Sequence, residues 1–294
     1  MDLKKVVRNI KYNEPMSKHT TFRVGGPADI FAEPEAHELL DLIRYLNESG
    51  QPYTVIGNGS NLLVGDKGIR GVVVALKDGI GDIDVEEDCE IYAGAGALLS
   101  RVASEAAACG LTGLEFASGI PGSVGGAIAM NAGAYDGEMK DVVSYVNAIH
   151  DNEFVKYGCN EMDFSYRHSR ILDSGDIVVG VCIKLAFGDM GTIRAKMSEL
   201  NQRRADKQPI NLPSAGSTFK RPEGYFAGKL IQDAGLRGYR VGGACVSEKH
   251  CGFVVNDQNA TAAEIKQLIE DVQNKVFEDA GVRLETEVRM IGEF

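Results

Sequence analysis

The chain has 294 residues, of which 44% are hydrophobic and 25% charged, as in an ordinary globular protein. The formal net charge of −11 and the lack of a basic tract argue against a nucleic-acid partner. The six cysteines form no Cys-x-x-Cys pair and have no histidine at zinc spacing, so we expect no metal site. We find neither a signal peptide nor an apolar run of roughly 20 residues, and therefore expect a cytoplasmic protein without a membrane partner.

Helices and strands are interspersed along the chain, which predicts the α+β class. Residues 3–18 are expected to form a short amphipathic helix and an approach loop. Further helices are predicted over 34–49, 98–109, 190–204, 225–234 and 261–280. Strands are predicted over 53–56, 72–76, 90–93, 142–150, 176–187, 252–256 and 283–291. Thr261 and Glu264 form a capping box for the last helix, and the last strand is expected to carry Glu285 and Glu287 on one face.

The densest glycine stretch runs from Leu114 to Tyr135, with small residues crowded between its glycines. So bare a backbone exposes its N–H groups and lets a large ligand lie against it. A flexible linker is the alternative interpretation, but linkers are polar, whereas Phe116, Val124 and Met130 are interleaved here. We therefore expect a flat or phosphorylated ligand to dock on this stretch.

Two shorter glycine turns lie upstream, and each follows an apolar run of strand character. They read Ile56-Gly-Asn-Gly-Ser-Asn-Leu62 and Ala93-Gly-Ala-Gly-Ala-Leu-Leu99. Both begin like the dinucleotide fingerprint Gly-x-Gly-x-x-Gly, but Leu62 and Leu99 occupy its third glycine position. A Rossmann interpretation is therefore weakly supported.

Six motifs carry a resemblance to known flavoproteins. Ile56–Leu63 and Ser118–Gly126 resemble the two flavin-pyrophosphate loops of the FAD-binding domain shared by vanillyl-alcohol oxidase and p-cresol methylhydroxylase. With these loops, the chain closely resembles the UDP-N-acetylenolpyruvoylglucosamine reductase family through four further motifs, His19–Ala28, Ser165–Ser169, Ala215–Lys220 and Leu284–Gly292. All six occur in the family order and extend over nearly the whole chain.

The resemblance implies a two-lobed FAD-binding domain followed by a smaller α/β substrate-binding domain. We expect lobe 1 over 1–70, lobe 2 over 71–205 and the substrate domain over 206–284, with a tail, 285–294, that returns to lobe 1. FAD is expected to bind without a covalent bond. The implied cofactor-binding residues are Gly57, Asn58, Gly59, Ser60, Asn61, Leu62, Ser118, Gly119, Ile120, Pro121, Gly122, Ser123, Gly125, Gly126, Asn131 and Gly133.

The family reduces the enolpyruvyl double bond of UDP-N-acetylglucosamine enolpyruvate with NADPH, in peptidoglycan precursor synthesis. Hydride from flavin N5 drives charge onto the adjacent carboxylate, so the site needs a cation and a proton donor. Arg167 matches the cation, Ser217 the proton donor and Glu287 the third catalytic member. Read without the resemblance, Arg167 also suits a surface ion pair, Ser217 a turn or helix cap, and Glu287 a pair with Arg289.

A UDP-sugar brings two phosphates, which require cations. Lys207 resembles the family's phosphate-binding lysine, and Lys229 is a further candidate in the substrate domain. Arg221 stands where some family members carry asparagine, which replaces an amide contact with a charge. The modest number of residues between Arg167 and Ser217 in the sequence suggests the shorter of the family's two subtypes.

Two other function classes stay open on the residues alone. One is a flavin-dependent oxidase of small alcohols, which the Ser217 and Glu287 motifs disfavour. The other is a nucleotide-binding regulatory or scaffold protein that uses the glycine loops only to hold a ligand. A flavin band in the visible spectrum is expected for both the reductase and the alcohol oxidase, and would distinguish them from the scaffold protein. We expect a monomer or a weak oligomer.

Overall fold

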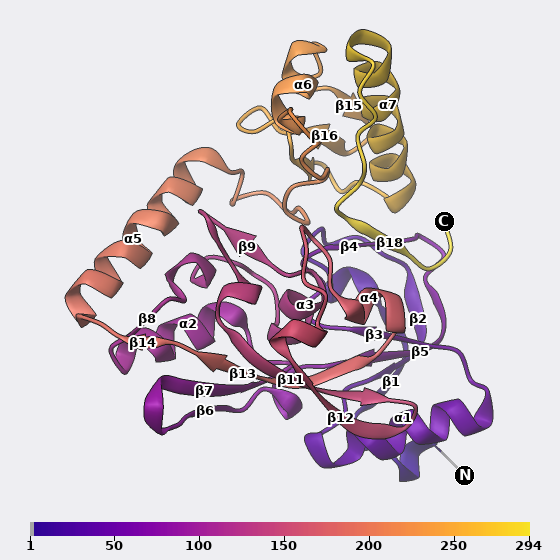
Figure 1. Cartoon of the computed structure of the whole chain (residues 1–294). Helices are drawn as coiled ribbons and strands as arrows, with labels where there is room; N and C mark the ends of the chain where they lie inside the picture. Colours follow the sequence, from indigo (N-terminus) through magenta and orange to yellow (C-terminus); the bar gives the residue numbers. More distant parts are fainter. Residues whose placement is uncertain (1–2) are drawn as a thin grey trace. The chain divides into compact units, whose positions relative to one another are not determined.

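The computed structural model describes residues 3–294, and they divide into two compact units (Figure 1). Each unit is assembled from segments that are separate in the sequence. Unit 1 comprises the chain up to Lys11, Ile30–Asn58 and Gly71–Arg203, and unit 2 comprises Tyr12–Asp29, Gly59–Arg70 and Arg204–Phe294. The three-part division at residues 70, 205 and 284 stays a prediction.

A four-stranded sheet has the order β1-β2-β5-β3. Its strands are β1 (Ile10–Pro15), β2 (Pro27–Ala32), β5 (Ile69–Ala75) and β3 (Tyr53–Ile56). β3 and β5 pair in parallel, and α1 (Ala36–Ser49) connects β2 to β3. α1 buries Leu39, Leu42 and Leu46 on one face, as its apolar spacing predicts. Gly50 caps the C-terminus of the helix in the left-handed conformation.

An antiparallel five-stranded sheet forms the body of unit 1, in the order β12-β11-β13-β7-β6. The strands are β12 (Glu153–Gly158), β11 (Val143–His150), β13 (Ile177–Lys184), β7 (Glu90–Gly94) and β6 (Ile83–Val85). α3 (Val124–Ala129) packs on β13 and β7, and α2 (Leu99–Ala108) lies against β6. Their apolar side chains form one continuous core.

Smaller elements complete unit 1. They are β8 (Leu111–Thr112), β14 (Ala186–Phe187), β9 (Gly133–Ala134), β10 (Gly137–Glu138) and α4 (Arg170–Ser174). The long helix α5 (Met190–Lys207) begins in unit 1 and ends in unit 2. Single 3-10 turns in unit 1 cover Leu3–Lys5, Asp78–Ile80, Glu87–Cys89, Glu115–Ala117, Met139–Asp141 and Cys159–Glu161, and one in unit 2 covers Met16–Lys18.

Unit 2 is built around α7 (Ala262–Ala280), which packs against a small antiparallel sheet and against α6 (Figure 1). The sheet contains β15 (Arg240–Val241), β16 (Ala244–Val246) and β17 (Val254–Asn256), and α6 spans Ala227–Asp233. A separate parallel pair joins β4 (Leu62–Val64) to β18 (Arg289–Ile291).

The N-terminus of α7 carries the predicted capping box. Thr261 Oγ1 accepts from the amide of Glu264, whose carboxylate accepts from the amide of Thr261. Asp66 adds a second cap, because its carboxylate accepts from the next two amides, those of Ala262 and Ala263. Asp66 is distant in sequence, and the capping pattern gave no sign of it.

Three predicted elements are wrong in part. The strand expected over 176–187 is divided into β13, which ends at Lys184, and β14, which pairs with β8 in a separate sheet. The amphipathic helix expected within residues 3–18 is replaced by β1 between two 3-10 turns, because Pro15 disfavours the helical region for Glu14. The last strand starts at Arg289 rather than near residue 283. Residues 285–287 are still paired, by a bridge between Phe219 and Thr286, but they do not belong to the β4–β18 ladder.

Asp176 ties together the three neighbouring strands β12, β11 and β13 at one end of the five-stranded sheet. The residue is 7% exposed, and its carboxylate accepts hydrogen bonds from His150 Nδ1 at 2.7 Å and from the Tyr157 hydroxyl at 2.9 Å. Burial acts to raise the pKa of Asp176, but these hydrogen bonds outweigh it and the net shift is downward. The same contact raises the pKa of His150.

We expect Asp176→Asn to destabilise the fold by about 1–3 kcal/mol near pH 6, because the buried carboxylate of Asp176 loses its charge-assisted hydrogen bonds to half-exposed His150 and to Tyr157. Protonated His150 contributes to the stability of the fold, and this contribution declines as pH rises above about 6.5 and through the raised pKa of His150. The contribution of the carboxylate is lost below about pH 4, as pH falls through the lowered pKa of Asp176. Urea unfolding across this range measures the difference.

Asp173→Asn is the matched control, because Asp173 accepts from His168 at 3.1 Å with an exposed carboxylate. The interpretation is wrong if Asp176→Asn is no less stable than this control at pH 6.

Candidate active site

The two predicted pyrophosphate loops meet inside unit 1. Asn58 Nδ2 donates to the carbonyl of Pro121 at 2.6 Å. A Cβ atom on Gly57 would lie 2.0 Å from Ser123 Oγ, so a larger residue at position 57 would force the Ser123 side chain to move. The first loop is irregular up to β4, whereas the predicted second loop is irregular only up to Ser123, because Val124–Gly126 begin α3. The sequence could not show that the two segments touch.

A third segment, Gly94–Ala97, supports the second loop from behind. The amides of Val124 and Gly125 donate to the carbonyls of Ala97 and Ala95, each at 2.8 Å. These two N–H groups are therefore not exposed, contrary to the expectation for the glycine stretch. In the sequence this upstream turn is only an incomplete fingerprint, because its supporting role depends on non-local contacts.

Ser123 has an unusual environment within this arrangement. The residue is 2% exposed, and its hydroxyl makes no hydrogen bond to any described residue. An unpaired buried hydroxyl costs about 1–3 kcal/mol. A flavin diphosphate would supply the missing acceptor, since serine and glycine turns commonly bind phosphate oxygens. The residues present therefore fit FAD, with Gly57, Asn58 and Ser118–Gly126 as the segments that would hold it.

Arg167 lies in a tight turn in which Ser165 and His168 exchange two backbone hydrogen bonds. It adopts a left-handed backbone, with φ of 57°, which is uncommon for a residue other than glycine. Its guanidinium donates to the carbonyl of Gly133 at 3.4 Å. The turn therefore places Arg167 beside the end of the glycine stretch in unit 1.

Asn131 holds that turn in place and is completely buried. Its Nδ2 donates to the carbonyl of Ser165 and to Glu138, and its Oδ1 accepts from the amide of Lys140. The side chain is committed to these protein contacts. Any contact of Asn131 with a flavin would therefore have to come from its backbone.

Ser217 and Glu287 are brought together in unit 2 through Thr218. The amide of Glu287 donates to the carbonyl of Thr218 at 2.9 Å, and the side chain of Asn61 donates to the carbonyl of Glu287 at 3.0 Å. Whether Ser217 donates a proton or caps a turn stays a prediction. Both predicted catalytic residues of this unit are partly buried.

The three candidate phosphate ligands are scattered over unit 2. Lys207 is the exposed last residue of α5, whereas Lys229 pairs with Asp233 one helical turn away. The guanidinium of Arg221 lies 4.0 Å from the ring centre of Phe226. The remaining predicted loop residues of this unit, Gly59, Ser60 and Leu62, lead directly into β4.

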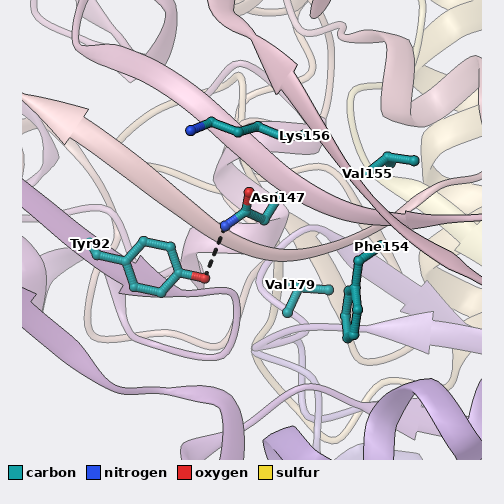
Figure 2. A pocket seen from close by; sticks show the side chains of 6 residues that line it. All are labelled: Tyr92, Asn147, Phe154, Val155, Lys156 and Val179. Atoms are coloured by element: carbon teal, nitrogen blue, oxygen red, sulfur yellow. Dashed lines mark hydrogen bonds between the residues drawn. The ribbon is translucent and has the colours of Figure 1, made fainter.

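A cavity of about 360 Å³ lies on the five-stranded sheet of unit 1. Figure 2 shows the side chains that line it. Tyr92 and Asn147 are joined by a hydrogen bond on one side of it, near Lys156, and Phe154 lies close to Val179 on the other side. None of these residues belongs to the predicted site. Among residues 3–294, no cluster of three metal-ligating side chains occurs, and no helix is long and apolar enough to span a membrane.

Comparison with known proteins agrees with this geometry. Residues 28–154 match the family described as FAD binding domain, and residues 208–291 match the C-terminal domain of UDP-N-acetylenolpyruvoylglucosamine reductase. The reductase of Agathobacter rectalis is 55% identical over 96% of this chain and 94% of its own length. The chain belongs to the UDP-N-acetylenolpyruvoylglucosamine reductase family.

Two further members of the family are similar to this chain over nearly its whole length. The reductase of Caldanaerobacter subterraneus is 52% identical over 99% of this chain and 97% of its own length. The crystal structure of UDP-N-acetylenolpyruvylglucosamine reductase from Thermus caldophilus superposes with a TM-score of 0.82 at 37% identity, over 96% of this chain and 98% of that chain. The α+β fold class, the FAD-binding domain and the nature of the protein as an FAD-dependent oxidoreductase are thereby confirmed.

We expect Ser123→Ala to leave the FAD-free reductase at least as stable as the wild type, because the substitution removes an unpaired buried hydroxyl. FAD should bind about 10- to 100-fold more weakly, since a hydrogen bond to a charged group is lost. Calorimetric titration and urea unfolding measure the two effects.

Ser104→Ala serves as the control, because Ser104 is exposed on α2 and its hydroxyl donates to the carbonyl of Ser100. An unchanged FAD affinity in Ser123→Ala would remove this serine from the diphosphate site.

Proposed function

We propose that this reductase converts UDP-N-acetylglucosamine enolpyruvate to UDP-N-acetylmuramate in peptidoglycan precursor synthesis, with NADPH as the electron source. The observation that carries the proposal is the cluster in unit 2, where segments bearing Ser217, Glu287 and the glycine-loop residue Asn61 are joined by hydrogen bonds. The names of the related proteins support the same reaction. When bound, FAD supplies the hydride that adds to the enolpyruvyl double bond.

Two side chains have distinct tasks in this proposal. Arg167 would bind the substrate carboxylate, because the planar fork of a guanidinium stabilises negative charge as it grows there. Ser217 would deliver the proton to the carbon next to that carboxylate. Serine is a weak acid, so Glu287 would assist by orienting the hydroxyl.

The cations in unit 2 suit a UDP-sugar to different degrees. Lys207 is exposed and takes part in no ion pair with a described residue, so it is the best placed to receive a phosphate. Lys229 is compensated by Asp233, which reduces its attraction for an anion. Arg221 keeps a guanidinium that could contact either phosphate or sugar.

The proposal is tested by mixing the FAD-loaded protein with NADPH and UDP-N-acetylglucosamine enolpyruvate. We expect NADPH oxidation to require the UDP-sugar and to yield UDP-N-acetylmuramate, identified by mass spectrometry. Hydrogen peroxide formed from a small alcohol, in the absence of NADPH and the UDP-sugar, would point instead to an oxidase.

We expect Ser217→Ala to leave the reduction of bound flavin by NADPH nearly intact and to slow flavin reoxidation by the UDP-sugar. The slowing should be about 10²- to 10⁴-fold, the usual contribution of a general acid. Stopped-flow absorbance follows the two half-reactions separately. If reoxidation proceeds at the wild-type rate, the proton comes from Glu287, a tyrosine or water.

Arg167→Lys should slow the same half-reaction by a different route, because lysine keeps the charge but loses the two-pronged geometry. We expect a loss of about 10- to 100-fold in reoxidation, with little change in flavin reduction. Arg170→Lys is the matched control, since Arg170 lies over the ring of Tyr157 and has no proposed role in the site. Equal effects of the two substitutions would assign Arg167 a structural role.

A further inference from the structure

The side chain of Asn61 is directed at the protein backbone. Its Nδ2 donates to the carbonyl of Glu287 at 3.0 Å. The carbonyl of Asn61 accepts from the amide of Arg289, also at 3.0 Å, where the β4–β18 ladder begins. Asn61 therefore holds the segment that carries Glu287 on both sides of Val288.

The other side of Glu287 is held equally firmly. Its amide donates to the carbonyl of Thr218, a completely buried residue adjacent to Ser217. Thr218 is itself fixed, because its amide donates to the carbonyl of Gly252 and its hydroxyl accepts from the amide of Val254. Both backbone polar groups of Glu287 are thus used, one toward the glycine loop and one toward the segment of Ser217.

We infer that Asn61 is a positioning residue for the proton-delivery step. Through the backbone of Glu287, its amide fixes the register of the glycine-loop segment Gly59–Leu62 against the pair Ser217 and Glu287. Misplacement of a reacting group by about 1 Å can cost about 10²-fold in rate. The inference rests on the proposed roles of Ser217 and Glu287, and it assigns the Asn61 side chain a task other than holding the cofactor.

Asn61→Asp is the most direct test, because aspartate has the same shape but presents an oxygen to the carbonyl of Glu287 in place of a donor. We expect flavin reoxidation by UDP-N-acetylglucosamine enolpyruvate to slow about 10- to 100-fold. Flavin reduction by NADPH should stay close to the wild-type rate, because it does not use Ser217 or Glu287. Asn61→Ala removes the donor without adding a charge and should slow the same half-reaction.

Gln273→Glu is the matched control. Gln273 Nε2, on α7, donates to the carbonyl of Leu284 at 2.8 Å. This substitution therefore removes an amide hydrogen bond to the same C-terminal segment and leaves the hydrogen bonds of Glu287 in place. The control should lose stability to a similar extent in urea unfolding while both half-reactions stay at the wild-type rate. FAD content, measured by absorbance, is compared across all variants.

Two outcomes would overturn the inference. Wild-type reoxidation in both Asn61 variants would show that the contact does not affect proton delivery. Equal slowing of both half-reactions, with loss of FAD, would mean that Asn61 only holds the glycine loop. Failure of the wild-type protein itself to be reoxidised by the UDP-sugar would overturn the proposed function as well, so the two failures are distinguishable.

Discussion

The backbone of Glu287 is the point on which the geometry of unit 2 depends. A residue in a ladder uses its amide and carbonyl on regular neighbours, whereas Glu287 gives its amide to Thr218 and its carbonyl to a side chain, Asn61. Three segments that are far apart in sequence are thereby held by one residue. Because the amide and the carbonyl of Glu287 are both held by hydrogen bonds, the position of its side chain is restricted as well.

Unit 1 depends on a different constraint, the close approach of three irregular segments. Gly57 lies against Ser123, and the segment Gly94–Ala97 takes up the first amides of α3. A Cβ on Gly96 would lie 1.9 Å from the carbonyl of Lys77, so the support is itself packed too closely for any other residue. These glycines do not confer flexibility. Gly57 gives room to the side chain of Ser123 and Gly96 to the carbonyl of Lys77. The Ser123 hydroxyl is buried there and has no hydrogen-bond partner among the described residues.

The elements that the sequence predicts well are those in which the stabilising contacts are local. α1 and α7 follow from apolar residues at helical spacing and from terminal residues that cap the backbone. The start of β18 could not be found in this way, because the carbonyl of Glu287 is taken by Asn61, more than two hundred residues earlier. The strand β1 could not be found from local pattern, because it is stabilised by pairing with β2, which is distant in sequence.

In the site, too, the sequence predicts which residues are candidates but not how they are arranged. Family motifs identified Arg167, Ser217 and Glu287 as candidates, but no pattern in the sequence distinguishes an asparagine that faces a ligand from one that faces the backbone. Asn58, Asn61 and Asn131 were all assigned to the cofactor on equal grounds. In the structure each of their amides donates to a backbone carbonyl, those of Pro121, Glu287 and Ser165 respectively.

Asparagine suits this use because a short, neutral amide satisfies a carbonyl without importing a charge. The glycine turns of a flavoprotein leave carbonyls that regular secondary structure does not pair, and unpaired carbonyls cost free energy when they are buried. An asparagine within or beside such a turn supplies the donor and at the same time joins the turn to a second segment. The polar residues of these motifs can therefore be retained for the shape of the site, independently of any contact with the ligand.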